Sequence, residues 1–103
     1  MAETETVNLT ISTTEVQSIS DVASIVANKV QGFANKYGVG QQYDKEMTEQ
    51  DLVFFMAKRN TLGLERLEVH ILDDGEIGIG SFRGRRKATL IFNINYVGRG
   101  YKL

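Results

Sequence analysis

The chain has 103 residues, of which 42% are hydrophobic and 24% are charged, and it contains neither cysteine nor proline. These values are typical of one globular domain, and they exclude a disulfide framework and a zinc site built on thiolates. No apolar run approaches the roughly 20 residues that a membrane-spanning helix needs, and the acidic, polar start (residues 1–5) argues against a secretory signal. We therefore expect a cytoplasmic protein that folds on its apolar core alone.

The net charge of −1 conceals a segregation of charge along the chain. Residues 1–76 hold all 13 acidic side chains and six of the 12 basic ones, whereas residues 77–103 hold the other six basic ones and no acid. Such segregation can indicate a surface that binds a partner. The alternative is that the two parts neutralise each other once the chain has folded.

The first predicted element is a strand at residues 6–12. Val7, Leu9 and Ile11 alternate there with polar residues. A period of two predicts a short, half-buried strand. We expect residues 1–5, which precede it, to be flexible.

A long helix is predicted next. Ser12 and Thr14 are each followed three positions later by Glu or Gln, which is the pattern of a hydroxyl cap at a helix start. Apolar residues then recur at spacings of three and four from Val16 to Tyr37, which predicts an amphipathic helix of about 24 residues. Gly38 stands where a left-handed cap would end this helix.

A second helix is predicted after a polar connection at residues 38–47. Thr48 is the expected hydroxyl cap, with Glu49 and Asp51 in the first turn. Residues 52–57 (LVFFMA) are apolar nearly all round, which predicts a helix wedged between two surfaces. Residues 58–63 would supply its basic C-terminal end and its stop.

Three further runs of alternation complete the pattern, at residues 67–72, 77–79 and 90–96, separated by turn-rich segments at 73–76 and 83–86. They predict a three-stranded antiparallel meander. The expected fold class is α+β in the order β-α-α-β-β-β: a four-stranded antiparallel sheet with two helices packed on one face. We expect a single domain over residues 1–103, with residues 98–103 flexible.

The segment from Arg83 to Lys87 is the densest charge feature and the tip of a predicted hairpin. Together with the C-terminal tail it is the candidate surface for a protein partner or for nucleic acid, with an aromatic ring available to stack on a base. Its residues are Phe82, Arg83, Arg85, Arg86, Lys87, Arg99, Tyr101 and Lys102. The alternative is a solvated turn whose charges pair with Glu65, Glu68, Asp73 or Asp74.

No motif indicates catalysis, a metal or a cofactor. His70 is the only histidine, and the alternation turns it away from the apolar face of its strand, toward Arg66 and Glu68. A histidine–carboxylate pair can transfer protons, but simple pairing on a sheet surface is far more common. We therefore expect no catalytic, cofactor-binding or metal-binding residue, and a protein that is not an enzyme.

Residues 7 to about 75 resemble the N-terminal half of the bacterial HORMA domains. The resemblance lies in the strand Val7–Ile11, the long helix ending at Tyr37-Gly38, the helix with Asp51-Leu52, and the strand 67–72 that ends at Asp73-Asp74-Gly75. HORMA domains are non-enzymatic adaptors that capture a peptide as an added strand under a C-terminal safety belt. The chain departs from that pattern after Tyr96, where no room for such a belt remains. The resemblance implies an adaptor role and assigns no binding residue.

The leading hypothesis is a small binding or adaptor protein that engages another protein, or a second copy of itself, through a sheet edge or its basic C-terminal surface. The alternative is a nucleic-acid-binding protein whose basic hairpin and tail contact phosphates. Ionic strength separates the two, because phosphate contacts weaken steeply with salt whereas strand addition hardly responds.

Overall fold

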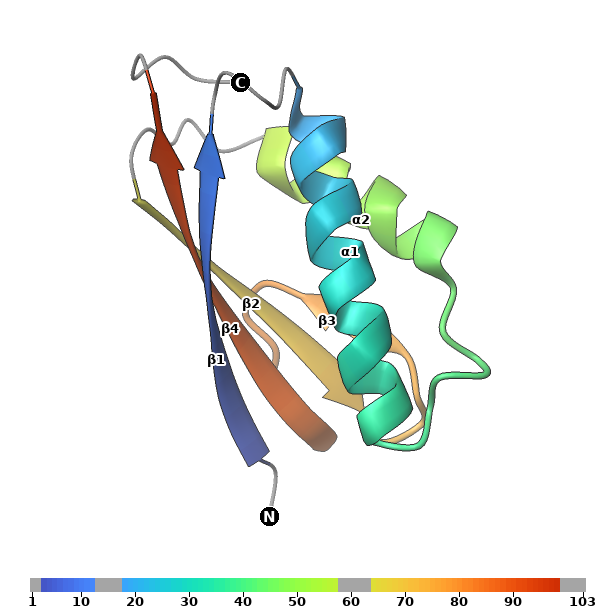
Figure 1. The fold of residues 1–103 in the computed structure, drawn as a ribbon. Helices are drawn as coiled ribbons and strands as arrows, with labels where there is room; N and C mark the ends of the chain where they lie inside the picture. The colour runs from blue at the N-terminus through green and yellow to red at the C-terminus, as the bar shows by residue number, and fades with distance from the viewer. Residues whose placement is uncertain (1–2, 13–17, 58–63, 99–103) are drawn as a thin grey trace.

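The computed structural model describes residues 3–12, 18–57 and 64–98. The predicted α+β class and the order of the elements are confirmed. Four strands form one sheet, and both helices lie on the same side of it (Figure 1). The elements are β1 (Glu3–Ser12), α1 (Ile19–Lys36), α2 (Lys45–Ala57), β2 (Leu64–Leu72), β3 (Ile77–Ile79) and β4 (Arg86–Val97). Strand β1 thus includes residues 3–5, which were expected in a flexible terminus.

The sheet is mixed, so the predicted all-antiparallel arrangement is wrong. Its strand order is β1-β4-β2-β3. Strand β1 pairs in parallel with β4, from Glu3 opposite Ala88 to Ser12 opposite Val97. Strands β4 and β3 each pair antiparallel with β2. The predicted meander is also wrong, because β4 lies beside β2 and not beside β3.

The connection between β3 and β4 crosses β2, because these two strands lie on opposite sides of it. Gly80 begins this crossing with a φ of +89°, and its N–H donates to the carbonyl of Glu68 at 2.9 Å. Strand β3 is only three residues long, since the chain leaves the edge of the sheet at that point. Residues 80–85 then return across β2 to the start of β4.

Helix α1 begins later than predicted. Ser18 is its N-cap, with an extended backbone and a side-chain oxygen that accepts from the Asp21 N–H at 3.3 Å. The predicted cap at Ser12 is wrong, because Ser12 is the last residue of β1, and the other predicted cap, Thr14, lies outside the described residues. The helix has 18 residues, and the longer helix expected from the apolar spacing is therefore wrong.

The C-terminal cap of α1 is the one predicted. Gly38 has a φ of +81°. Its N–H bonds to the carbonyl of Asn35 at 3.2 Å, and the N–H of Val39 bonds to the carbonyl of Ala34 at 2.9 Å. This pair of bonds is the Schellman motif, in which a left-handed residue satisfies the last carbonyls of a helix.

Helix α2 begins earlier than predicted, and the cap expected at Thr48 is wrong. Asp44 caps the helix: its carboxylate accepts from the Met47 N–H at 2.9 Å, where an acid also faces the positive end of the helix dipole. Thr48 lies inside the first turns, 4% exposed, and its hydroxyl donates to the Asp44 carbonyl at 2.9 Å. The stop predicted at residues 58–63 lies outside the described residues.

The core lies between the sheet and the helices. Helix α1 presents small and β-branched side chains to it: Val22, Ala23, Val26, Ala27, Val30 and Ala34. The sheet contributes Ile11, Leu67, Val69, Ile71, Leu90, Phe92 and Ile94. Helix α2 adds Leu52 and Met56, but its Phe54 is 64% exposed. The predicted wedge between two surfaces is therefore wrong, because one side of α2 faces solvent.

Neither helix, over the residues described, combines the length and the apolar content needed to cross a bilayer.

Candidate functional site

The predicted basic surface is not the tip of a hairpin. Arg83 and Arg85 lie in the connection that crosses β2, whereas Arg86 and Lys87 are the first residues of β4. The side chains of Arg83, Arg85 and Lys87 are exposed. The side chains of Phe82 and Arg86 are instead partly buried and lie against His70 of β2. Three predicted members, Arg99, Tyr101 and Lys102, lie outside the described residues.

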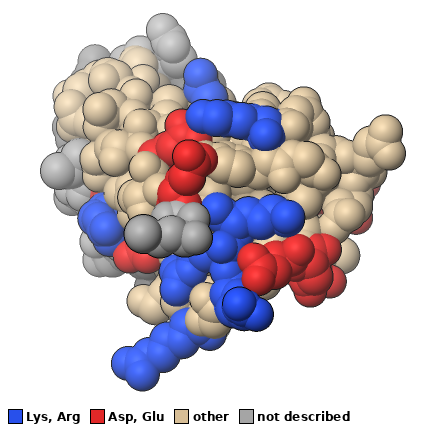
Figure 2. Space-filling model, turned by 90° about the horizontal axis from the view of Figure 1, so that it is seen from below, with Lys and Arg blue, Asp and Glu red and all other residues tan. Residues whose placement is uncertain are grey.

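Acidic side chains lie among the basic ones at this end of the molecule. The Nε of Arg85 is 4.0 Å from the carboxylate of Asp73, and the Arg85 side chain is 94% exposed. Figure 2 views the end where Figure 1 shows the N-terminus: Lys and Arg side chains gather there, with Asp and Glu side chains beside and between them. The alternative expectation, pairing with Asp73, is thus confirmed for Arg85, and exposed pairs of this kind contribute little stability.

His70 lies on the face of the sheet turned away from the helices, as the alternation predicts. The His70 side chain is 1% exposed. The centroid of the Phe82 ring lies 5.8 Å from that of the imidazole, and the Arg86 guanidinium lies over the Phe82 ring. Its Nε2 is 2.8 Å from the Gly80 carbonyl oxygen and its Nδ1 is 3.0 Å from the Thr89 hydroxyl. A carbonyl only accepts, so Nε2 carries the proton and Nδ1 accepts from Thr89 and from Arg86.

The His70 ring therefore fastens the crossing connection to the sheet. Both ring nitrogens have partners, and the Glu68 carboxylate lies 3.4 Å from Nε2. The hydrogen bond from Arg66 lowers the pKa of Glu68, which keeps that carboxylate ionised. A general base must reach its substrate, and a ring 1% exposed has no such access. The geometry gives His70 a structural role.

A second polar cluster joins β1 to the end of α1. The Lys36 ammonium is 2.8 Å from Oε2 of Glu5, and the Tyr37 hydroxyl donates to the same oxygen. These bonds lower the pKa of Glu5, with Lys36 the largest cause, and the same carboxylate raises the pKa of both Lys36 and Tyr37. The cluster fixes the first part of β1 against the helix layer.

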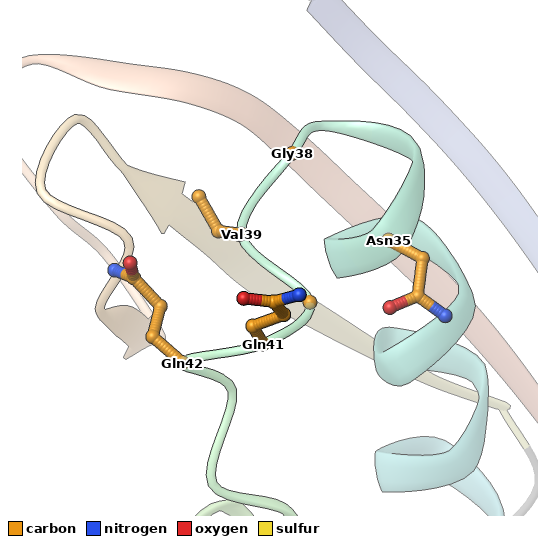
Figure 3. A pocket seen from close by; sticks show the side chains of 6 residues that line it. Asn35, Gly38, Val39, Gln41 and Gln42 are labelled. Carbon is orange, nitrogen blue, oxygen red and sulfur yellow. The ribbon is translucent and has the colours of Figure 1, made fainter.

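A shallow pocket of about 340 Å³ lies at the C-terminal end of α1. Figure 3 shows Asn35 projecting from the helix, and Gln41 and Gln42 projecting from the loop that follows. The Gln42 amide donates to the carbonyl of Asp74 at 2.6 Å and so joins this loop to the β2–β3 turn. The described lining consists of amides, glycines and a valine, so it supplies neither an acid–base group nor a nucleophile.

The outer edge of β1 is the long open edge of the sheet. Strand β1 has ten residues, whereas β3 at the other edge has three. Its pairing with β4 runs without interruption. No other strand among the described residues pairs with it, so a row of backbone N–H and C=O groups faces outward.

Strand β1 carries few of the features that usually protect an edge. Natural edge strands are blunted by lysine, proline, bulges or short length. Residues 6–11 (TVNLTI) contain no charge and no proline, and the charged residues of β1, Glu3 and Glu5, stand at its start. Val7 and Leu9 are half-buried beside the core. An added strand would therefore find backbone partners and apolar contacts together.

Sequence reasoning named a sheet edge as a candidate but not the strand that forms it. Alternation marks a strand without giving its neighbours, so only the order β1-β4-β2-β3 identifies β1. It also missed the exposure of Met47 and Phe54 on α2. The sequence indicates that exposure only weakly: acidic residues flank the apolar run at residues 52–57, and such a run by itself predicts burial.

No protein-family model, curated protein or solved structure matches the chain. Within residues 3–12, 18–57 and 64–98, no group of three or more His, Asp or Glu side chains could hold a metal ion. The resemblance to the bacterial HORMA domains stays a prediction.

Proposed function

We propose that this protein is a small, non-enzymatic, cytoplasmic binding protein that engages another protein by adding a strand of that partner to β1. The observation that carries the proposal is the outer edge of β1, a strand that is regular in register and that has β4 as its one partner among the described strands. In strand addition the main-chain hydrogen bonds supply affinity, and alternate side chains supply specificity.

The two faces of β1 define the partner sequence. On the side of the helices, the partner would contact Val7 and Leu9, which are half-buried. On the opposite side it would contact Thr6, Asn8 and Thr10, which are exposed. We therefore expect a segment that alternates apolar and polar residues, with β-branched side chains preferred on both faces.

The test begins with random decapeptides displayed on phage and selected on the immobilised protein. A selected peptide, once synthesised, should bind the protein with a Kd of about 1–100 μM. Its affinity should change little between about 50 and 500 mM NaCl, because main-chain bonds and apolar contacts are not screened as exposed charges are. Binding should slow hydrogen exchange at β1 amides. Selection that yields no peptide, or protection outside β1, would overturn the proposal.

A matched pair of variants locates the contact. Thr6→Lys places a charge on the edge strand, and Asn95→Lys places the same charge on β4, an inner strand; both positions are exposed on the face away from the helices. We expect Thr6→Lys to weaken the selected peptide about tenfold, because lysine discourages pairing at an edge. Asn95→Lys should leave the affinity unchanged. Equal weakening by both would contradict binding at the edge.

The exposure of Arg83, Arg85 and Lys87 supports a second candidate, binding of nucleic acid through phosphate contacts. Three contacts predict that log K falls with log salt at a slope of about −2 to −3. Fluorescence anisotropy with a labelled 20-nucleotide single strand measures this slope. Arg83→Glu combined with Arg85→Glu should abolish the binding if this candidate holds, and a flat salt response would exclude it.

A further inference from the structure

The outward side of α2 carries exposed apolar side chains. Met47 is 57% exposed and Phe54 is 64% exposed, and Val97 at 39% is the other large hydrophobic residue so exposed among those described. Residues seven apart lie on the same face of a helix, two turns from each other. Met47 and Phe54 therefore form an apolar stripe along α2, about 10 Å long at 1.5 Å rise per residue.

Hollows border this stripe on both sides. One, of about 640 Å³, lies between Phe54, Val53 and Ser20 of α1. Another, of about 300 Å³, lies between Phe54, Phe55 and Ile79 of β3. Because Phe54 lines both, its ring stands between two depressions that could each accept an apolar side chain. A third hollow, of about 520 Å³, extends past Met47 to the β2–β3 turn.

The rim of these hollows is acidic. Glu46 and Glu49 line the first, and Asp51 lines the second and the third. The third adds Asp44, Asp74 and Glu76. Among the described residues that line the three hollows there is no lysine or arginine, and Lys45 is held by Glu49 at 3.6 Å. Apolar contact and negative charge thus occur together on what we call the α2 surface, the outward face of α2 that carries Glu46, Met47, Glu49, Gln50, Asp51 and Phe54.

We propose that the α2 surface binds an amphipathic, basic helical segment of another protein. Apolar residues of that segment, spaced as i, i+3, i+4 and i+7, would enter the hollows beside Phe54 and Met47. Lysine and arginine on its flanks would pair with Glu46, Glu49 and Asp51. Charge complementarity decides the occupant, because a basic segment adds counter-charge to a rim on which Lys45 already pairs with Glu49, whereas an acidic segment would bring like charges together. The proposal is independent of strand addition at β1.

A synthetic 18-residue peptide with leucines at helical spacing and lysine and arginine on both flanks is the probe. Two control peptides accompany it: one has the same composition in scrambled order, and the other has glutamate in place of every basic residue. Titration by fluorescence anisotropy should show saturable binding for the probe alone. Saturation by the scrambled peptide as well, or none by the probe below about 1 mM, would overturn the proposal.

Three variants of the full chain complete the test. Phe54→Ala removes the apolar anchor, and Gln50→Lys adds a positive charge to the α2 surface; each should weaken the probe at least tenfold. Asn28→Lys adds the same charge at an exposed position of α1, and it should change the affinity less than twofold. Circular dichroism should show unchanged unfolding for all three. If Asn28→Lys weakens binding as much as Gln50→Lys, or Phe54→Ala has no effect, the α2 surface is not the site.

Discussion

One buried imidazole holds the β3–β4 connection on the sheet. His70→Ala would leave the Gly80 carbonyl and the Thr89 hydroxyl without the ring that bonds both. The loss of buried hydrogen bonds should lower the free energy of unfolding by about 1–3 kcal/mol. Urea denaturation measures this, and His70→Gln should lose less because its amide still donates. An unchanged unfolding midpoint in His70→Ala, with unchanged exchange at residues 80–86, would contradict the role of the ring.

Replacement of two glycines by alanine should change the free energy of unfolding in opposite directions. Gly80 has a φ of +89°, and an added Cβ would lie 2.9 Å from the ring of Phe55. Gly32, in the middle of α1, has open space around it. Gly80→Ala should therefore destabilise by more than about 1 kcal/mol, whereas Gly32→Ala should stabilise by about 0.5–1 kcal/mol through helix propensity. Thermal unfolding of both variants checks the contrast, which fails if they shift in the same direction.

At the scale of elements, the junction between β1 and α1 makes stability depend on pH at both extremes. The pKa of Glu5 is lowered from 4.5. The stability that its ionised carboxylate contributes is therefore present above pH 4.5 and is lost as the pH falls through the lower pKa of the folded state. The pKa of Tyr37 is raised from 10.0, so the folded state loses stability as the pH rises above 10.0.

The corresponding variants isolate the two groups. Glu5→Gln should be less stable than the natural chain near neutral pH, and the difference should disappear at acidic pH, where the natural carboxylate is protonated too. Tyr37→Phe should lack the additional loss of stability at alkaline pH. Urea midpoints measured from about pH 3 to pH 11 test both. A difference between Glu5→Gln and the natural chain that persists unchanged into acid would show that the charge of Glu5 is not the cause.

Period and cap patterns predicted which segments become helix or strand better than where they begin. The segment around Ser12, Thr14 and Ser18 offers several hydroxyl caps, and the structure uses Ser18. Asp44 and Thr48 compete in the same way for α2, and the carboxylate of Asp44 makes the cap. Each candidate satisfies the same local chemistry, so the choice depends on where the apolar side of the helix meets the sheet.

The direction and order of strands are a property of the assembled sheet. Val7, Leu9 and Ile11 alternate identically whether β1 runs parallel or antiparallel to its neighbour, so alternation predicted the strand but not its partner. The parallel pairing places β1 at an edge, and that position makes it the candidate site. The predicted basic surface loses Phe82 and Arg86 for a related reason: the crossing connection places Phe82 beside His70, and Arg86, the first residue of β4, contacts the same imidazole.

At the scale of the whole molecule, the two proposed surfaces lie at different sides. Helix α2 contacts β3, which is the edge of the sheet opposite to β1. Helix α1 lies along the sheet on the same side as α2 (Figure 1). A strand added at β1 would therefore leave the α2 surface open to a second partner. Occupation of both at once is the geometry that an adaptor requires.

Hydrogen exchange over the whole chain tests the arrangement from which both proposals start. Strands β4 and β2 are the inner strands, each paired on both sides. Their backbone amides should therefore exchange slowest. In β1, successive N–H groups point alternately toward β4 and outward. We therefore expect slow and fast amides to alternate along residues 4–11, because the outward groups bond only to water.

The dependence of this alternation on concentration separates a free edge from a self-paired one. At micromolar protein the alternation should be complete. If every amide of residues 4–11 exchanges slowly under those conditions, the outer edge is already paired or covered, and strand addition of a partner at β1 is excluded. If the alternation disappears only as the concentration rises, a second copy of the chain is the added strand, because pairing between copies follows mass action.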